Sequence, residues 1–369
     1  MSTPQPRRIN RRDFLKLFAA GSAASAGGYG LYEFAPWLDY ESQAEQVRTF
    51  MKEDSPIRNL IHYATLAANG HNIQPWKFAV QENTIEIHPD YSRELKVVDP
   101  QHRELWISLG CALENLLLAA RATGYAAEVS YPDSSDIIRV DLTSDTPQPN
   151  PLFDAIPERQ NTRSEYDGRP IPASDLDRIL SLPIEPGVSL RFVTAANELE
   201  TLVDYVNQGN LSQYVDNAFV DELIEWLRFN KRDALAAMDG LYSVCSGNPE
   251  VPGWLGRMFV AGTKPGQQAD VDAKKLRSSS AAVVIASETE DKSTWVRTGQ
   301  VYERLALQTT AMGIKSAFLN QPIEVSELRS QFQSAVGLGT SQPQLLMRFG
   351  YAASLPRSLR RPVDQVLIS

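Results

Sequence analysis

Residues 110–124, "GCALENLLLAARATG", align with residues 299–313, "GQVYERLALQTTAMG", without a gap. The apolar spacing predicts a helix in both segments, and each ends at a glycine suited to a left-handed helix cap. A strand-like run follows each, "YAAEVSYP" after the first and "IKSAFLNQP" after the second. The identical residues are Gly110, Glu114, Leu116, Leu118, Ala122 and Gly124, which match Gly299, Glu303, Leu305, Leu307, Ala311 and Gly313. This repeat predicts two related halves in tandem; the alternative is that two Leu- and Ala-rich helices are alike by chance.

A proline-rich stretch between the matched helices marks the expected boundary of the two halves. Residues 147–152 read "PQPNPL", which is typical of a linker. The sequence therefore predicts a first half over residues 36–146 and a second half over residues 153–369.

The second half carries an insertion near residues 217–262. It combines an amphipathic helix that contains Phe219 and Trp226 with a Gly/Pro-rich loop that carries Trp254 and Met258. Two interpretations stay open. The segment is either a cover over a pocket or an accessory hairpin packed against the body.

The first half contains a polar junction, "ANGHNIQPWKF", at residues 68–78. A helical stretch precedes it, and residues 76–90 alternate like a strand. A plain turn needs Gly or Asn, but not Gln, Pro and Trp as well. The simpler interpretation is a capped helix end followed by a buried Trp76. The second half has no counterpart, so the two halves are expected to contribute different parts of one site.

Composition excludes several classes of function. The 369-residue chain, with 43% hydrophobic and 22% charged residues, reads as an ordinary globular protein. Its net charge of -9 argues against a nucleic-acid partner. Neither cysteine, Cys111 or Cys245, lies in a metal-ligand spacing, so no metal site is predicted. Cys111 falls within an apolar helical run and is expected to be buried.

Residues 1–35 have the layout of an export signal, a basic stretch before a short apolar run rich in Ala, Gly and Ser. Residues 10–16, "NRRDFLK", resemble the twin-arginine motif. The apolar run is too short for a stable membrane span. We therefore expect the twin-arginine export machinery to carry the protein to a periplasmic or other extracytoplasmic location. A basic disordered arm is the alternative.

Two arginine clusters stand out in this acidic chain. Residues 159–163 read "RQNTR", and two guanidinium forks spaced in this way can hold a phosphate bidentately. Residues 357–361 carry the second cluster. Taken alone, the cluster at residues 159–163 would be interpreted as a solvated basic turn. The presence of two separate clusters in an acidic chain favours the binding of a small anionic ligand. Neither Gly-rich phosphate-loop motif is present in the sequence.

These motifs, in this order, resemble the nitroreductase family of FMN proteins, in particular its fused, twin-arginine-exported branch similar to the mycobacterial Acg proteins. "GHNIQPWKF" resembles the family's N-x-Q-P-W-x-F stretch, and "RQNTR" stands where the family has Arg-x-Ser-x-Arg. "GIKSAFLNQP" and "PQLLMRFGYAASLPRSLRRPVDQVL" resemble the flavin-facing segment and the Arg-rich end. The resemblance implies an α+β nitroreductase-like fold. Each tandem half would be a mostly antiparallel sheet flanked by helices, and the halves would form an internal pseudo-dimer.

The resemblance also implies FMN as the cofactor, one per chain, and assigns its contacts. Arginines of both clusters would grip the phosphate, and Asn161 would bond the phosphate or the ribityl chain. The junction residues would reach the flavin from the other half. Backbone N–H groups of Asn320 and Gln321 would face flavin N5 and O4, where negative charge develops on reduction. The implied set is His71, Asn72, Gln74, Arg159, Asn161, Arg163, Asn320, Gln321, Arg357, Arg360 and Arg361.

By this resemblance the chain is an FMN-dependent oxidoreductase that passes electrons from NAD(P)H or another donor to a nitroaromatic, quinone or similar small-molecule acceptor. The alternative is a protein that binds or sequesters FMN with little turnover. No catalytic acid or base is expected, because the flavin carries the chemistry. Helix capping and surface charge are the expected roles of Asp99, His102, Arg103 and Glu104. Because the pseudo-dimer replaces a second chain, a monomer or weak homodimer is expected.

Overall fold

The computed structural model describes residues 32–35, 37–49, 55–131 and 135–368. The export-signal prediction falls mostly on residues 1–31, which lie outside the described residues, so it stays a prediction. Glu33, assigned to the signal segment, is buried against the insertion. One of its carboxylate oxygens accepts from Asn230 Nδ2 at 3.1 Å and from the Gly253 backbone N–H at 3.3 Å.

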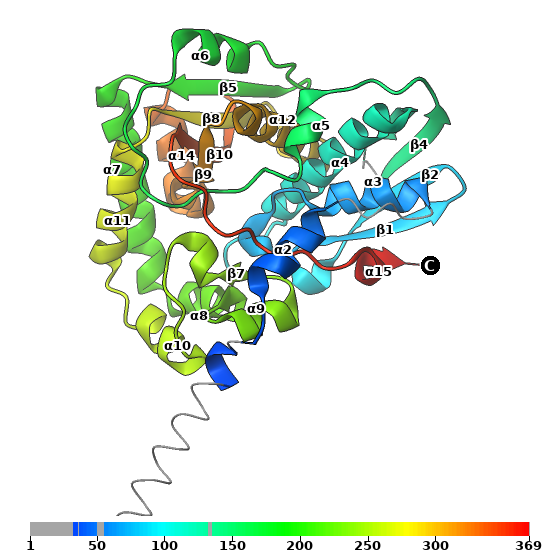
Figure 1. Cartoon of the computed structure of the whole chain (residues 1–369). Coiled ribbons are helices and arrows are strands. Elements are labelled where there is room, and N and C mark those ends of the chain that lie inside the picture. Colours follow the sequence, from blue (N-terminus) through cyan, green and yellow to red (C-terminus); the bar gives the residue numbers. More distant parts are fainter. Residues whose placement is uncertain (1–31, 36, 50–54, 132–134, 369) are drawn as a thin grey trace, which may run out of the picture.

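The chain is α+β as expected, and its two larger sheets are mostly antiparallel (Figure 1). The first sheet has five strands in the order β11-β1-β2-β4-β3, and the second has four in the order β5-β8-β10-β9. The strands are β1 (Trp76–Gln81), β2 (Thr84–Pro89), β3 (Tyr125–Ser130), β4 (Ile138–Ser144), β5 (Val188–Val193), β8 (Ala281–Ser287), β9 (Lys315–Phe318), β10 (Gln342–Gly350) and β11 (Leu367–Ile368).

Residues 76–90, which alternate like one strand, form the hairpin β1–β2. Glu82 has a positive φ of 52° and reverses the chain direction there. Trp76 begins β1 and is fully buried, as the simpler interpretation of the junction expects.

Helices cover both sheets. Their bounds are α2 (Tyr40–Arg48), α3 (Pro56–Thr65), α4 (Arg103–Thr123), α5 (Pro151–Ala155), α6 (Ala173–Leu180), α7 (Ala196–Val215), α8 (Asn217–Trp226), α9 (Lys231–Ala237), α10 (Gly253–Ala261), α11 (Pro265–Arg277), α12 (Lys292–Ala311), α13 (Gln321–Glu324), α14 (Ser326–Ala335) and α15 (Val363–Val366). Short 3-10 turns lie at η1 (Gly70–Asn72), η2 (Tyr91–Arg93) and η3 (Ser243–Ser246), and β6 (Leu227–Arg228) pairs with β7 (Leu241–Tyr242) inside the insertion.

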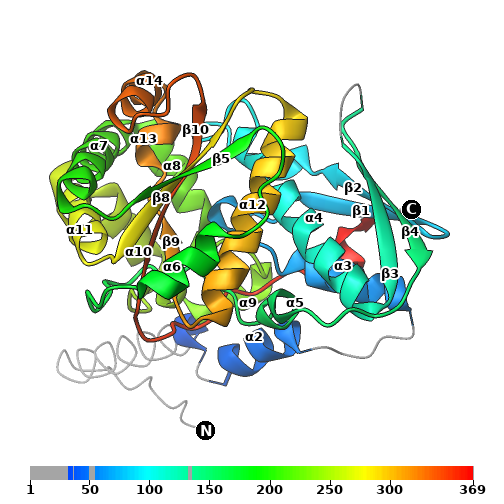
Figure 2. The same ribbon diagram turned by 90° about the horizontal axis from the view of Figure 1, so that it is seen from above.

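The two matched segments are the helices α4 and α12, which lie side by side between the sheets (Figure 2). They approach most closely at the matched glycines. A Cβ added to Gly110 would lie 2.0 Å from the Val296 carbonyl oxygen, and one on Gly299 would lie 2.0 Å from the Ile107 oxygen. Only a residue without a side chain fits at this crossing.

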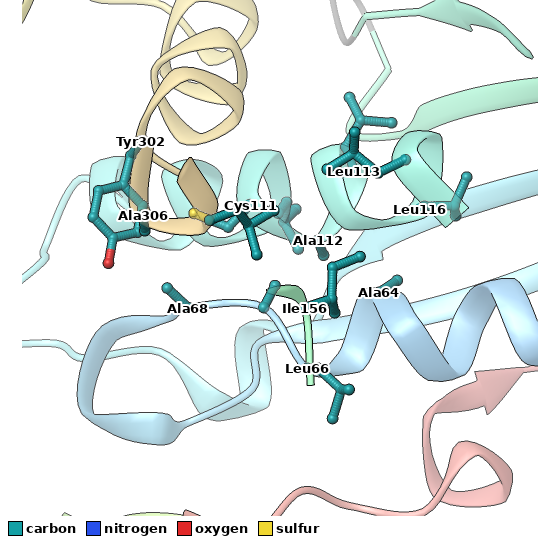
Figure 3. Packing of buried hydrophobic residues seen from close by; sticks show 14 of the residues in the cluster. Ala64, Leu66, Ala68, Cys111, Ala112, Leu113, Leu116, Ile156, Tyr302 and Ala306 are labelled. Atoms are coloured by element: carbon teal, nitrogen blue, oxygen red, sulfur yellow. The ribbon is translucent and has the colours of Figure 1, made fainter. Parts of the chain in front are cut away.

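The core extends from this crossing into the first half. Figure 3 shows Cys111 and Ala112 of α4 near Tyr302 and Ala306 of α12, with Ala68 on the other side. Cys111 is buried, as predicted. Among the described residues, α4 alone has the length and hydropathy to cross a membrane, but 83% of its apolar window is buried inside the protein.

The C-terminal segment links the halves. From β10 in the second sheet, the chain runs across to the first half, where β11 pairs with β1 in parallel (Figure 1). This path carries the second arginine cluster past the polar junction of residues 68–78.

Candidate functional site between the two halves

A cavity of about 250 Å³ lies between the halves. The first half contributes residues 68–71 and the beginning of α4. The second half contributes Arg163, Tyr302 and the segment 317–321, where β9 leads into α13. Residues of both matched helices therefore line this cavity, together with other residues from each side of the expected boundary.

The insertion forms another wall of this cavity. Phe219 and Leu223 of α8 and Leu241 of β7 line it, together with Tyr214 at the end of α7. Phe219 packs edge-on against Tyr214, with ring centroids 5.6 Å apart. This position favours the interpretation of the insertion as a cover over the pocket, rather than as an accessory hairpin packed against the body.

A second, polar cavity of about 40 Å³ adjoins the first. The two share Ala68, Asn69, Arg163 and Leu241 in their walls. Its basic lining comes from segments far apart in sequence: Arg48, Arg159, Arg163 and Arg360. A cavity needs roughly 10–15 Å³ to hold one water, so this one has room for a compact anion.

These four guanidinium groups have too few carboxylate partners. Arg159 pairs with Glu303 at 2.9 Å. Arg360 donates to the Asn72 side-chain oxygen and to main-chain carbonyls, all of them neutral. Arg163 makes no hydrogen bond or ion pair within the described residues. Burial lowers the pKa of Arg163 and of Arg360, and the neighbouring Arg48 and Arg159 lower the pKa of Arg360 further. The cluster has a surplus of buried positive charge, which an anion would neutralise.

The polar junction positions the walls of both cavities. His71, Asn72 and Gln74 all have positive φ values, 45°, 55° and 53°, a conformation that is strained for residues other than glycine. Asn72 Nδ2 donates to the carbonyl oxygen of Gly240 at 3.0 Å, and its Oδ1 accepts from Arg360 at 2.8 Å. Gln74 Nε2 donates to the Met238 carbonyl at 2.9 Å. The junction thus fastens the insertion and the C-terminal segment to the first half.

His71 lines the larger cavity and carries a polar atom without a partner in the described part of the chain. Its Nδ1 is buried and has no hydrogen-bond partner among the described residues. Burial, and then the charge of Arg163, lower the pKa of His71 to about 4. The imidazole is therefore neutral at pH 7.

The predicted site residues divide into four groups. His71, Asn320 and Gln321 line the larger cavity; Asn72, Arg159, Asn161 and Arg360 line the smaller; and Arg163 lines both. Gln74, Arg357 and Arg361 line neither. Arg361 donates its backbone N–H to Gln74 Oε1 at 2.7 Å, while Arg357 pairs with Glu158. These three side chains serve contacts within the protein, and the cofactor contacts assigned by resemblance stay predictions.

Sequence reasoning missed Arg48 and misjudged the cluster before α4. Arg48 is the last residue of α2 and is buried in the smaller cavity. Asp99 accepts the Leu105 backbone N–H at 2.8 Å, so the capping prediction is right. The surface-charge prediction is wrong for Asp99, Arg103 and Glu104, which are buried. Arg103 donates to the Gln344 carbonyl and Asn320 donates to Glu104, so these two side chains also contact the second half, which local spacing could not indicate.

Acidic side chains also line the larger cavity. Glu104 and Glu324 line it, and Gln213 donates to Glu324 at 2.6 Å. Burial, and then the nearby Glu104, raise the pKa of Glu324 to about 8. Burial and Glu104 also raise the pKa of Asp99 to about 6. The cavity therefore holds a carboxyl group that is largely protonated near neutral pH.

Relatives in Mycobacterium tuberculosis span almost the whole chain. Over 334 residues it is 28% identical to "Putative NAD(P)H nitroreductase Rv3131", covering 87% of this chain and 93% of that protein. It is 23% identical over 324 residues to "Putative NAD(P)H nitroreductase acg", and the alignment covers 84% of this chain and 94% of that protein. The chain is a homologue of these nitroreductase-named proteins. The nitroreductase resemblance is thereby confirmed. No protein-family model matches the sequence.

Solved nitroreductases resemble the structure over about one half. A Bacteroides fragilis nitroreductase with bound FMN aligns with a TM-score of 0.35 and 17% identity, over 56% of this chain and 90% of that one. The FMN-dependent nitroreductase NfnB of Mycobacterium smegmatis, in complex with NADPH, aligns with a TM-score of 0.37 and 13% identity. The alignment covers 55% of this chain and 87% of that one. Each alignment covers little more than half of this chain.

Proposed function

We propose that the chain is an FMN-dependent oxidoreductase that passes electrons from NAD(P)H or another donor to a nitroaromatic, quinone or similar flat acceptor. The observation that carries this proposal is the buried arginine cluster at the end of a cavity between the halves. Flavin mononucleotide has a flat, amphipathic ring at one end and a doubly charged phosphate at the other. The two adjoining cavities match this division of chemistry.

The residues present fit the cofactor. Arg163 is partly buried, lines both cavities and has no hydrogen-bond or ion-pair partner among the described residues. Its guanidinium therefore has all its donors available for a phosphate. His71, which lines the larger cavity, has a second polar atom without a partner among the described residues. Apolar side chains such as Phe219, Leu223 and Leu319 supply walls for a ring.

When bound, FMN supplies hydride acceptance and donation. Arg159, Arg163 and Arg360 would bind and orient its anionic end. Asn320 and Gln321 stand at the beginning of α13, where the first backbone N–H groups have no acceptor within the helix. They line the larger cavity and can stabilise negative charge that develops there.

Sequestration of FMN with little turnover is the second candidate, and the cavity size favours it. Ligand pockets usually measure about 300–1,000 Å³. The larger cavity has about 250 Å³. A bound ring would fill most of it, and the insertion closes one wall. Turnover then requires the insertion to move, whereas sequestration does not.

The deciding experiment uses the purified protein reconstituted with FMN. It is mixed without oxygen with NADH, NADPH or, as a chemical control, dithionite, while the flavin band at about 450 nm is followed. Fast bleaching by a nicotinamide, reversed by a quinone or nitroaromatic, establishes the oxidoreductase. Bound flavin that only dithionite reduces favours sequestration. Failure to bind FMN at all refutes both candidates.

A further inference from the structure

The helix α2 delivers a residue into the smaller cavity that no motif identifies. Arg48 is 3% exposed and lines this cavity with Arg159, Arg163 and Arg360. Its Nη1 donates to the Pro157 carbonyl at 3.1 Å, and its Nη2 donates to the Ser358 carbonyl at 3.3 Å. Its Nε is buried without a partner among the described residues.

Arg48 sits in an unfavourable electrostatic position. Burial first, and then the charges of Arg159 and Arg357, lower the pKa of Arg48 to about 9. Arginine nevertheless keeps its proton at neutral pH. Its polar partners are neutral carbonyl oxygens, which solvate a charge without neutralising it. An anion in the cavity would supply the missing negative charge.

The rest of α2 is attached to segments that surround the same cavity. Tyr40 and Ala44 pack with Tyr242, Cys245 and Leu359 in a small apolar cluster. The Tyr40 hydroxyl donates to the main-chain carbonyl of residue 357 at 2.9 Å. The helix is thus held by a modest apolar contact at one end and by Arg48 at the other.

We propose that Arg48 is a ligand of the cofactor's phosphate, and that α2 is a strap whose docking is coupled to the binding of that phosphate. This inference rests on the proposed FMN-binding function and extends it to a segment outside the family-like motifs. Coupling of two events is reciprocal. The phosphate therefore holds α2 in place, and docked α2 slows the escape of the phosphate.

Arg48→Gln tests the ligand role by comparing FMN with riboflavin, which lacks the phosphate. We expect FMN affinity to fall by about 10- to 100-fold, as for loss of a charged hydrogen bond, while riboflavin affinity is unchanged. Arg48→Lys keeps the charge and should retain most of the preference for FMN. Arg169→Gln is the control, because Arg169 is 67% exposed and pairs with Asp167 on the surface.

Hydrogen exchange of the α2 backbone amides tests the coupling. In the wild type, FMN should slow exchange over residues 40–48, whereas riboflavin should not, and Arg48→Gln should abolish the protection. The inference is overturned if Arg48→Gln binds FMN as tightly as the wild type does, or if FMN leaves the exchange rates of the α2 amides unchanged. Either result leaves the proposed function intact. A wild-type protein that binds no FMN refutes the function itself, and the inference with it.

Discussion

Among the described residues, Glu303 is the carboxylate that pairs with the arginine cluster, and its replacement by Gln separates folding from cofactor binding. Its side chain is fully buried on α12. One oxygen lies 2.9 Å from Arg159 Nε, and the other accepts the Ala68 backbone N–H at 3.2 Å. Burial raises the pKa of Glu303, while Arg159 and the Ala68 N–H act in the opposite direction.

Loss of one partner from a buried ion pair costs about 3–5 kcal/mol. Gln keeps an acceptor for the Ala68 N–H, so we expect the lower end, about 3 kcal/mol of unfolding free energy in the FMN-free protein. This corresponds to a drop of roughly 5 °C in Tm. FMN should then stabilise Glu303→Gln more than the wild type, because its phosphate replaces the lost negative partner of Arg159. A recovery of about 1 kcal/mol corresponds to roughly fivefold tighter FMN binding.

Thermal unfolding with and without saturating FMN, together with FMN titration, measures both quantities. The matched control is Glu114→Gln at the repeat-matched position. Glu114 pairs with Arg304 at 2.8 Å and lines neither cavity, so FMN should give it no extra stabilisation. The reasoning is refuted if Glu303→Gln binds FMN more weakly than the wild type, or if both variants respond equally to FMN.

Three further changes probe the cavity and the helix crossing. Arg163→Gln should abolish FMN occupancy, read from the visible spectrum, without lowering the Tm of the FMN-free protein, because Arg163 has no described partner. Gly110→Ala should cost about 3 kcal/mol or more in denaturant unfolding, since its Cβ would meet the Val296 oxygen at 2.0 Å; Gly266→Ala, with nothing within 4 Å, is its control. Glu324 has a folded pKa of about 8, above its usual value of 4.5. Its stabilising contribution is therefore complete below pH 4.5 and is lost as the pH rises through 8, so Glu324→Gln should lose less stability over that interval than the wild type.

Each of these expectations has a contradicting result. A flavin-loaded Arg163→Gln protein would mean that the other arginines suffice for the phosphate. Equal stability of the two Gly→Ala variants would show that the helices separate at little cost. Parallel pH–stability curves for Glu324→Gln and the wild type would place the titrating group elsewhere.

The sequence predicted what local patterns determine. Apolar spacing and terminal glycines located α4 and α12, whose caps at Gly124 and Gly313 have positive φ values of 94° and 73°. The arginine pair at residues 159 and 163 reaches the smaller cavity as a cluster with Arg360. The helix predictions succeeded because the needed information lies within a few residues of each position, whereas the role of the arginines in binding a phosphate stays a prediction.

What failed depends on long-range packing. Arg48 is a single arginine at the end of a short helix, and only the path of the C-terminal segment brings it next to Arg360. The contacts of Gln74 are also long-range: it belongs to the family-like motif, and its polar atoms bond Met238 and Arg361; its contact with a cofactor stays a prediction. Glu104 was predicted to be a surface charge because an Arg-Glu pair next to each other in sequence is typical of an exposed helix start. In the structure Glu104 pairs with Arg103 at 2.8 Å inside the protein, and residues of the second half line the same cavity.

The pairing of β11 with β1 fixes the order in which this chain can mature. The first sheet is among the earliest parts synthesised, yet its edge strand comes from residues 367–368, so the sheet stays incomplete while the ribosome makes the second half. An unpaired edge is a template for association with other strands. The first half should therefore need protection during translation. Expressed alone, it should aggregate, and adding back the C-terminal segment as a separate peptide should restore its solubility.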